Sequence, residues 1–245
     1  MTELQILVVA MAFLVAGFSK GVVGMGLPPI AIGLMTFTLP LDDALAIMTL
    51  PTLATNAWQA FYGGHFRAML QRFWMLGVTA VVGVLLIAWA FGKLGSPGAV
   101  AWLGVVLVVY AVIALAAWRP RVKRAWETWS NPLFGFASGA IAGITGIAAV
   151  PFLPYMQSLE LTKDELVQAL GILFVFIIGA IAVALVGKGS FDLANTVGGL
   201  LANIPAFLGV WLGQKARNAV SPETFRKIFL VGMLGIGLHM ARGLL

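Results

Sequence analysis

Long apolar stretches separated by short polar or basic segments dominate the pattern of hydrophobic positions. Apolar runs such as residues 75–92 and 100–117 are long enough, with their flanks, to form helical spans of about 20 residues. They lack the strict alternation of apolar and polar residues that is typical of membrane barrel strands. The pattern predicts helices near residues 42–62, 69–92, 97–118, 163–187, 192–213 and 222–244.

Two further apolar segments, residues 4–39 and 133–158, contain clusters of glycine and proline that should interrupt a helix. The stretch "GFSKGVVGMGLPP" from Gly17 aligns with "GFASGAIAGITGIAAVP" from Gly135, and each is followed by an acidic loop and another apolar run. The order of features predicts a duplication. The predicted parts are a first transmembrane repeat (1–118), a basic cytoplasmic linker (119–132) and a second repeat (133–245).

Composition places the chain among membrane proteins. Of 245 residues, 61% are hydrophobic and 10% are charged, with a mean hydropathy of +1.01. Soluble domains have about 45–50% apolar and about 25% charged residues. We therefore expect an all-α integral membrane protein. The chain has no cysteine, which excludes disulfides and thiolate sites. The net charge of +6 resides in short loops and does not indicate nucleic-acid binding.

The distribution of basic residues favours one of two topologies. If each broken segment crosses the membrane once, Lys and Arg divide almost evenly between the two sides. If each segment is a hairpin of two short half-helices, the second repeat inverts and only Lys93, Lys188 and Arg242 lie opposite the linker. Basic residues concentrate in cytoplasmic loops. We predict two inverted-topology repeats, each a Gly/Pro-broken segment plus three transmembrane helices.

Lys20 is the one formally charged side chain that the pattern places deep within an apolar segment. A central lysine costs about 2.5–3.5 kcal/mol on insertion scales, so such residues usually face a cavity or a partner. No Asp or Glu lies in a predicted span, and a bound anion could take the place of such a partner. Alternatively, Lys20 extends along the helix to water at the membrane surface.

The broken segments have features of an anion site. Gly21, Gly24 and Gly26 should interrupt the helix, and Pro28 suits the first turn of a new half-helix, whose positive end would face the membrane centre. The second repeat offers the corresponding residues Ser138, Gly143, Thr145 and Gly146. Paired broken segments of this kind often mark the binding site of a transporter.

Polar residues follow one face of two predicted helices. Thr49, Thr52, Asn56 and Gln59 share a face of helix 42–62, and Asn195, Gly199 and Asn203 share a face of helix 192–213. They either line a pathway or form interhelical hydrogen bonds worth roughly 0.6 kcal/mol each. Gly209 and Gly213 predict helix packing. The predicted substrate-binding residues are Lys20, Gly21, Gly24, Gly26, Pro28, Asn56, Gln59, Ser138, Gly143, Thr145, Gly146 and Asn203.

The two glycine-rich segments ending in proline, at 17–29 and 135–151, resemble the repeated signature of the sulfite exporter TauE/SafE family of membrane transporters. So does "PAFLGVWLGQKARNAVSPETFRKIF", Pro205–Phe229. The resemblance implies transport of small sulfur-containing anions such as sulfite or organosulfonates across the bacterial cytoplasmic membrane, driven by ion or proton gradients. The first motif reads "GMGLPP" where members often carry three consecutive glycines, which leaves the substrate open.

The sequence can also be compared with two other functions, an anion channel and an intramembrane enzyme. An anion channel could use the same site without a coupling ion. An intramembrane enzyme would need a catalytic constellation, and Ser19 and Lys20, adjacent on a helix, point about 100° apart. We therefore expect no catalytic residue, metal or cofactor. The expected partners are a small sulfur oxyanion, the lipid bilayer and a coupling proton or Na⁺, and a homodimer is compatible with a bundle of this size.

Overall fold

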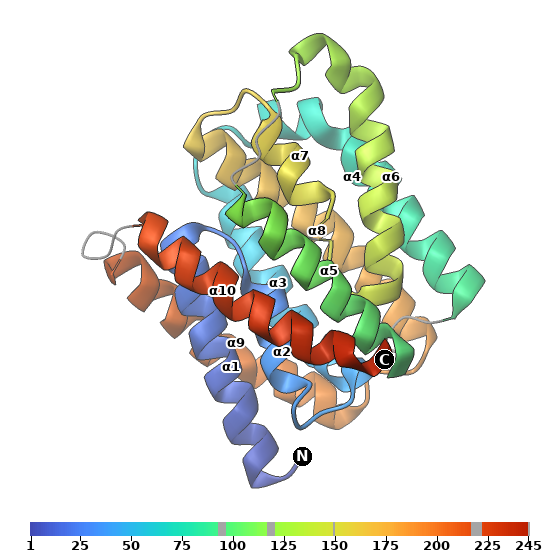
Figure 1. The fold of residues 1–245 in the computed structure, drawn as a ribbon, viewed down its shortest axis with the longest axis vertical. Coiled ribbons are helices and arrows are strands. Elements are labelled where there is room, and N and C mark those ends of the chain that lie inside the picture. Colours follow the sequence, from blue (N-terminus) through green and yellow to red (C-terminus); the bar gives the residue numbers. More distant parts are fainter. Residues whose placement is uncertain (93–96, 117–120, 149, 217–221, 245) are drawn as a thin grey trace.

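The computed structural model describes residues 1–92, 97–116, 121–148, 150–216 and 222–244, and within these ranges it is helical without strands (Figure 1). The all-α prediction is confirmed. Two short 3₁₀ turns are also present, at Arg124–Trp126 and Arg242–Leu244. The α-helices are α1 (Glu3–Val23), α2 (Leu27–Met35), α3 (Leu41–Phe61), α4 (Phe66–Phe91), α5 (Pro97–Leu115), α6 (Glu127–Thr145), α7 (Phe152–Ser158), α8 (Lys163–Gly187), α9 (Leu193–Ala216) and α10 (Pro222–Ala241).

Among the described residues, 5 helices are long and apolar enough to cross a membrane. These spans are Glu3–Val22, Phe66–Phe91, Gly98–Leu115, Lys163–Gly187 and Leu193–Ala216. Helix α3 has the length of a span, with 21 residues, but it carries two aspartates in its first turn and the polar stripe. These residues lower its hydropathy. Lys93 and the end of the predicted helix 97–118 lie outside the described residues.

Both broken segments form two helices, but their first helices are longer than the predicted half-helices. Helices α1 and α6 contain 21 and 19 residues, whereas α2 and α7 contain 9 and 7. Helix α6 begins at Glu127, inside the predicted linker. The predicted break at Gly21 is wrong, because the chain leaves α1 at Gly24 (φ 85°) and enters α2 at Gly26 (φ 101°). Both angles favour glycine.

Gly21 stays helical because it packs against α9. A Cβ atom at Gly17 or Gly21 would overlap the carbonyl oxygens of Ala206 and Val210, respectively. In return, Gly209 and Gly213 of α9 face the backbone of α1 just as closely. Small residues allow two helix backbones to approach, so the packing role predicted for Gly209 and Gly213 is confirmed.

Helices α4 and α6 form an equivalent close pair. Gly135 and Gly139, which align with Gly17 and Gly21, meet the carbonyl oxygens of Leu76 and Ala80 in α4. Exchanging the two repeats therefore converts the α1–α9 pair into the α6–α4 pair. Each predicted repeat thus uses the same glycine spacing to hold its first helix, α1 or α6, against a helix of the other predicted repeat, α9 or α4.

Each broken segment turns back toward the end of the bundle where it started. In the first repeat, the Gln5 side chain at the start of α1 donates to Thr38 O, beyond the end of α2, at 3.1 Å. In the second, Val122 N, before α6, donates to Ser158 O at the end of α7 at 3.0 Å. This return is the hairpin geometry that the inverted topology requires.

Contacts between repeats define two ends of the bundle. At the linker end, His65 N donates to Gln168 Oε1 at 2.7 Å, and Arg72 of α4 pairs with Glu127 of α6. At the N-terminal end, the Asn195 side chain donates to Asp43 Oδ1 at 2.9 Å. Helices α1 and α6 therefore begin at different ends. These contacts support the inverted repeat, which stays a prediction of membrane topology.

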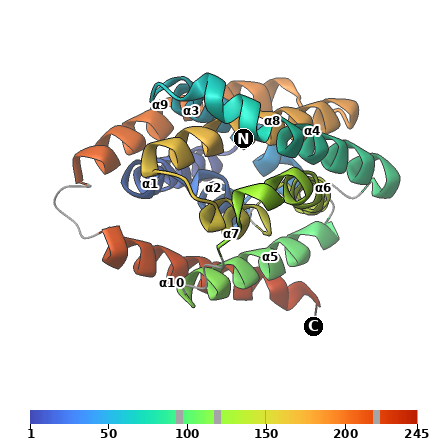
Figure 2. The same ribbon diagram turned by 90° about the horizontal axis from the view of Figure 1, so that it is seen from above.

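The helices are arranged in three layers (Figure 2). Helices α1, α2, α7 and α6 form the middle layer, between a row made of α9, α3, α8 and α4 and the adjacent pair α5 and α10. Because the short helices α2 and α7 lie in the middle layer, both chain breaks are enclosed by longer helices. The fold thus brings irregular backbone of both repeats into the interior.

Candidate functional site

Lys20, near the end of α1, is buried and bonded to α3. Its side chain is 7% exposed, and Nζ donates to Asn56 Oδ1 at 2.6 Å and to Thr55 Oγ1 at 3.2 Å. Among the described residues, no carboxylate forms an ion pair with Lys20 within 4.0 Å. The alternative interpretation required the side chain to extend to water at the membrane surface, and it does not do so.

Thr55, which is not among the predicted site residues, is oriented by a hydrogen bond within α3. Its hydroxyl donates to Pro51 O at 2.8 Å, so the oxygen lone pairs remain available to accept from Lys20. Thr55 is adjacent to Asn56 and lies off the stripe identified by helical spacing. The long lysine side chain reaches both residues, a contact that the spacing within one helix does not reveal.

The other stripe residues bond elsewhere. Thr49 donates to Leu45 O of its own helix at 2.8 Å. Gln59 Nε2 donates to Val167 O of α8 at 2.7 Å, and Gln168 Nε2 of α8 donates to Ala60 O at 2.7 Å. This reciprocal pair joins the two repeats. Both Gln59 and Asn56 therefore bond between helices, Gln59 to the backbone of α8 and Asn56 to the lysine of α1.

The two chain breaks meet at one small cavity. Gly26 and Pro28 of the first break and Gly146 of the second line a cavity of about 20 Å³, together with Tyr110 and Ile177. A buried water needs about 10–15 Å³ on this measure, so the cavity has room for roughly one water. Three predicted site residues thus converge between the repeats, in a space smaller than a sulfur oxyanion.

The start of α2 offers fewer backbone donors than a usual helix N-terminus. Pro28 and Pro29 have no N–H, and Ile30 N already donates to Gly26 O at 3.3 Å. Of the first four residues of α2, Leu27 alone has a backbone N–H that is neither missing nor bonded to Gly26 O. The expected cradle of backbone amides is therefore reduced, and the positive charge of the region falls to Lys20.

The second repeat has no charge at the position equivalent to Lys20. Aligning Gly17 with Gly135 places Ser138 opposite Lys20, and Ser138 is fully buried and donates to Phe134 O within α6 at 2.5 Å. Thr145 donates to Ile141 O at 2.9 Å. The two broken segments are therefore related in sequence but unequal in charge.

Three predicted site residues lie in helix contacts or within one helix. Gly21 packs on α9, and Gly143 packs on α4, where a Cβ atom would lie 2.8 Å from Val84 O. Asn203 donates to Gly199 O of its own helix at 3.0 Å, and its Oδ1 is buried without a partner among the described residues. Gly24 ends α1, and a Cβ atom there would lie 3.5 Å from Val167.

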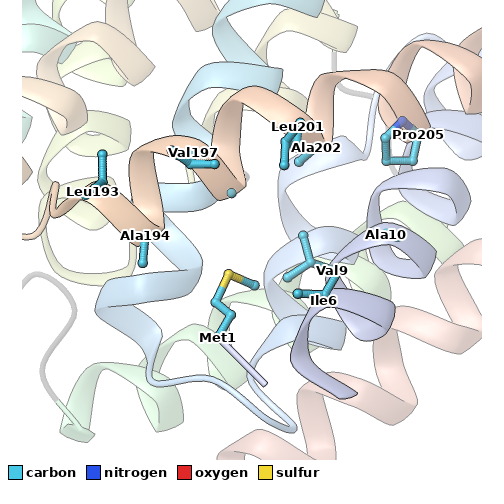
Figure 3. A pocket seen from close by; sticks show the side chains of 11 residues that line it. Met1, Ile6, Val9, Ala10, Leu193, Ala194, Val197, Leu201, Ala202 and Pro205 are labelled. Atoms are coloured by element: carbon cyan, nitrogen blue, oxygen red, sulfur yellow. The ribbon is translucent and has the colours of Figure 1, made fainter. Parts of the chain in front are cut away.

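A larger cavity lies between the first part of α1 and the first part of α9 (Figure 3). Its volume is about 570 Å³, and the Met1 side chain extends into it opposite α9. Its lining residues are Met1, Ile6, Val9, Ala10, Leu193, Ala194, Val197, Gly198, Leu201, Ala202 and Pro205. None of them has a charged or polar side chain, so this apolar cavity is unsuited to an oxyanion.

Comparison with known families identifies the chain. The family model described as "Sulfite exporter TauE/SafE" matches residues 9–240. The chain belongs to the TauE/SafE family. Comparisons with curated proteins and with solved structures gave no match. The TauE/SafE match extends over both predicted repeats and the predicted linker, and together with the 5 apolar helices it describes a multi-pass membrane protein.

Proposed function

We propose that the protein is a secondary transporter, acting as an exporter, of small sulfur-containing anions such as sulfite or organosulfonates. The observation that carries this proposal is Lys20, which is buried in the protein, bonded to two neutral side chains and not paired with a carboxylate. A buried cation usually has a counter-charge. A transported anion would supply that counter-charge while it is bound.

The proposed site extends from Lys20 and Asn56 toward the meeting point of the two breaks. Gly26, Pro28 and Gly146 already share the small cavity there, and the other predicted residues surround this region or support its helices. A cavity of about 20 Å³ cannot hold sulfite, so the helices around it must separate to bind an anion. This requirement favours a carrier with alternating access over a permanently open channel.

The predicted inverted repeat provides a mechanism for alternating access. If the second repeat is inverted, exchanging the conformations of the two repeats converts a site open to one side into a site open to the other. The glycine contacts of α1 with α9 and of α6 with α4 join each first helix to the other repeat, so these pairs would move as units. The bacterial cytoplasmic membrane, a proton or Na⁺ as coupling ion and a homodimer belong to the same proposal.

An enzyme with a Ser–Lys pair finds no support in the geometry. Ser19 Oγ is buried without a hydrogen-bond partner among the described residues, and Lys20 Nζ instead donates to α3. The hydroxyl and the amine are therefore not bonded to each other. A transporter uses Lys20 as a binding group and needs no such pair.

The proposed function is tested by reconstitution in proteoliposomes. Vesicles loaded with sulfite or sulfoacetate should release the anion when wild-type protein is present, and external substrate should accelerate that release if the protein is a carrier. Lys20→Met should reduce release to the level of loaded vesicles that contain no protein. Release without acceleration would indicate a channel, and equal release by Lys20→Met would exclude Lys20 as the anion-binding group.

A further inference from the structure

The hydrogen bonds of Lys20 match an uncharged amine. A neutral –NH₂ group has two N–H donors, whereas an ammonium has three. Lys20 Nζ has two acceptors among the described residues, Asn56 Oδ1 and Thr55 Oγ1. Both N–H groups of the neutral form would therefore be satisfied. A third proton would create a charged donor that lacks a protein acceptor in a buried site, which is costly.

Among the described residues, no side chain around Lys20 supplies a compensating charge within 4.0 Å. Helices α2, α9 and α10 pack on α1, α3 bonds to Lys20, and α8 lies beside Gly24. Helix α2 carries no titratable residue. The titratable side chains described on the other four helices are Asp42, Asp43, Lys163, Asp164, Glu165, Lys215, Lys227 and His239. None of them forms an ion pair with Lys20 within 4.0 Å.

Two of these carboxylates are already committed elsewhere. Asp43 at the start of α3 accepts from the Asn195 side chain, and Glu165 at the start of α8 accepts from Thr162 N at 2.8 Å. Asp42 belongs to the first turn of α3, whereas Thr55 and Asn56 lie toward its other end. The amine is thus held where no described carboxylate pairs with it within 4.0 Å and little solvent reaches it to stabilise its protonated form.

We propose that Lys20 takes up one proton together with each anion. The inference rests on the proposed anion site and adds a co-transported proton to it; in export the outward gradient of the anion itself would have to drive both. In the anion-free state, Nζ is a neutral amine bonded to Asn56 and Thr55. The anion and a proton from water then bind together: the nitrogen lone pair accepts the proton, and the new N–H donates to the anion. The site gains one negative and one positive charge and stays neutral overall.

The difference between Lys20 and the aligned Ser138 sets the number of protons taken up with each anion. Ser138, which aligns with Lys20, is a hydroxyl bonded within its own helix and cannot take up a proton at neutral pH. One proton per anion therefore follows from one amine per chain at the site. Release of the anion on the other side leaves an uncompensated ammonium, so the proton leaves with it, and the carrier returns neutral.

Calorimetry of the full chain in detergent tests the inference. Methanesulfonate and ethanesulfonate serve as probes, because both are monoanions that stay fully ionised between about pH 6 and pH 9 and bring no proton of their own. Each is titrated at one pH in HEPES and in Tris, whose ionisation enthalpies differ. If binding takes up a proton from the buffer, the observed heats differ between the two buffers. The difference should equal the difference between their ionisation enthalpies multiplied by about one proton per anion bound. The apparent affinity should also fall about tenfold for each pH unit of increase above neutrality.

The outcomes separate this inference from the proposed site. Binding by wild type with the same heat in both buffers overturns the proton uptake and leaves the anion site standing. No binding of either probe overturns both. Lys20→Arg provides the matched control, since arginine is always charged. It should bind the anion without proton uptake, and the same proton uptake in this variant would place the titrating group elsewhere.

Discussion

Lys20 Nζ on α1 donates to Asn56 Oδ1 on α3 across 2.6 Å, in the interior of the bundle. The acceptor is an amide, so this contact fixes the position of the lysine and supplies no carboxylate to pair with its protonated form. An aspartate at the same place would form an ion pair and leave no charge for a ligand. The choice of asparagine is thus what makes Lys20 available to an anion.

Asn56→Asp should therefore abolish anion binding while leaving the protein folded. The new carboxylate would lie within hydrogen-bond distance of Nζ and compete with any anion for it. We expect the affinity for sulfite or sulfoacetate to fall by more than about tenfold, which corresponds to about 1.4 kcal/mol. Titration calorimetry measures this change. Asn56→Ser, which keeps an uncharged acceptor, should bind far better than Asn56→Asp, and equal binding by the two variants would be inconsistent with the account.

Gly139→Ala should destabilise the pair formed by α4 and α6. A methyl group at this position would overlap Ala80 O, and backbone cannot move aside as a side chain can. Overpacking of this kind costs about 1–3 kcal/mol. The thermal midpoint in detergent should fall accordingly. Gly179→Ala in α8 is the control, because no atom lies within 4 Å of its added methyl. A similar fall in both variants would show that the close contact is not responsible.

Glu127→Gln should weaken the linker end of the bundle. Glu127 accepts two hydrogen bonds from the guanidinium of Arg72, at 2.8 and 2.5 Å, and both side chains are largely buried. Removing the carboxylate charge leaves a buried cation without its partner, at a cost of about 3 kcal/mol. Denaturation of the purified protein measures the loss. Glu160→Gln, a matched change at an exposed residue, should have almost no effect.

Single cysteines can test the inverted topology, because the chain contains no native cysteine. The inverted arrangement places Lys123, in the linker, and Ser190, between α8 and α9, on opposite sides of the membrane. Eight full crossings would place both on the same side. Membrane-impermeant thiol reagents applied to intact cells should therefore label Ser190→Cys and spare Lys123→Cys. Labelling of both, or of neither until the cells are opened, would favour parallel repeats.

Much of the helical pattern follows from the sequence because long apolar runs have few structural solutions in a membrane. The predicted helix 163–187 coincides with α8, and the predicted helix 42–62 is shifted by one residue from α3. The breaks near Gly26 and Gly146 were also expected. In each case the signal is local: hydrophobic length, or glycine beside proline.

The sequence around an individual glycine does not determine which role that glycine has in the fold. Gly21 and Gly24 look alike in sequence, yet Gly21 packs inside a helix and Gly24 adopts a left-handed conformation. The difference depends on whether another helix approaches, which is a tertiary property. The same holds for Thr55, whose contact with Lys20 spans 35 positions. Helical periodicity identifies residues that share a face, but it does not identify what that face meets.

The central claim is that Lys20 binds the anion, and ligand-induced thermal stabilisation tests it most directly. Wild type, Lys20→Met and Lys215→Met would be compared with sulfite, sulfate, sulfoacetate, taurine, thiosulfate and chloride; Lys215 is an exposed lysine near the end of α9. A ligand that binds the folded state raises the midpoint. The account predicts a rise with a sulfur anion in wild type and Lys215→Met, and none in Lys20→Met. An equal rise in Lys20→Met would contradict it.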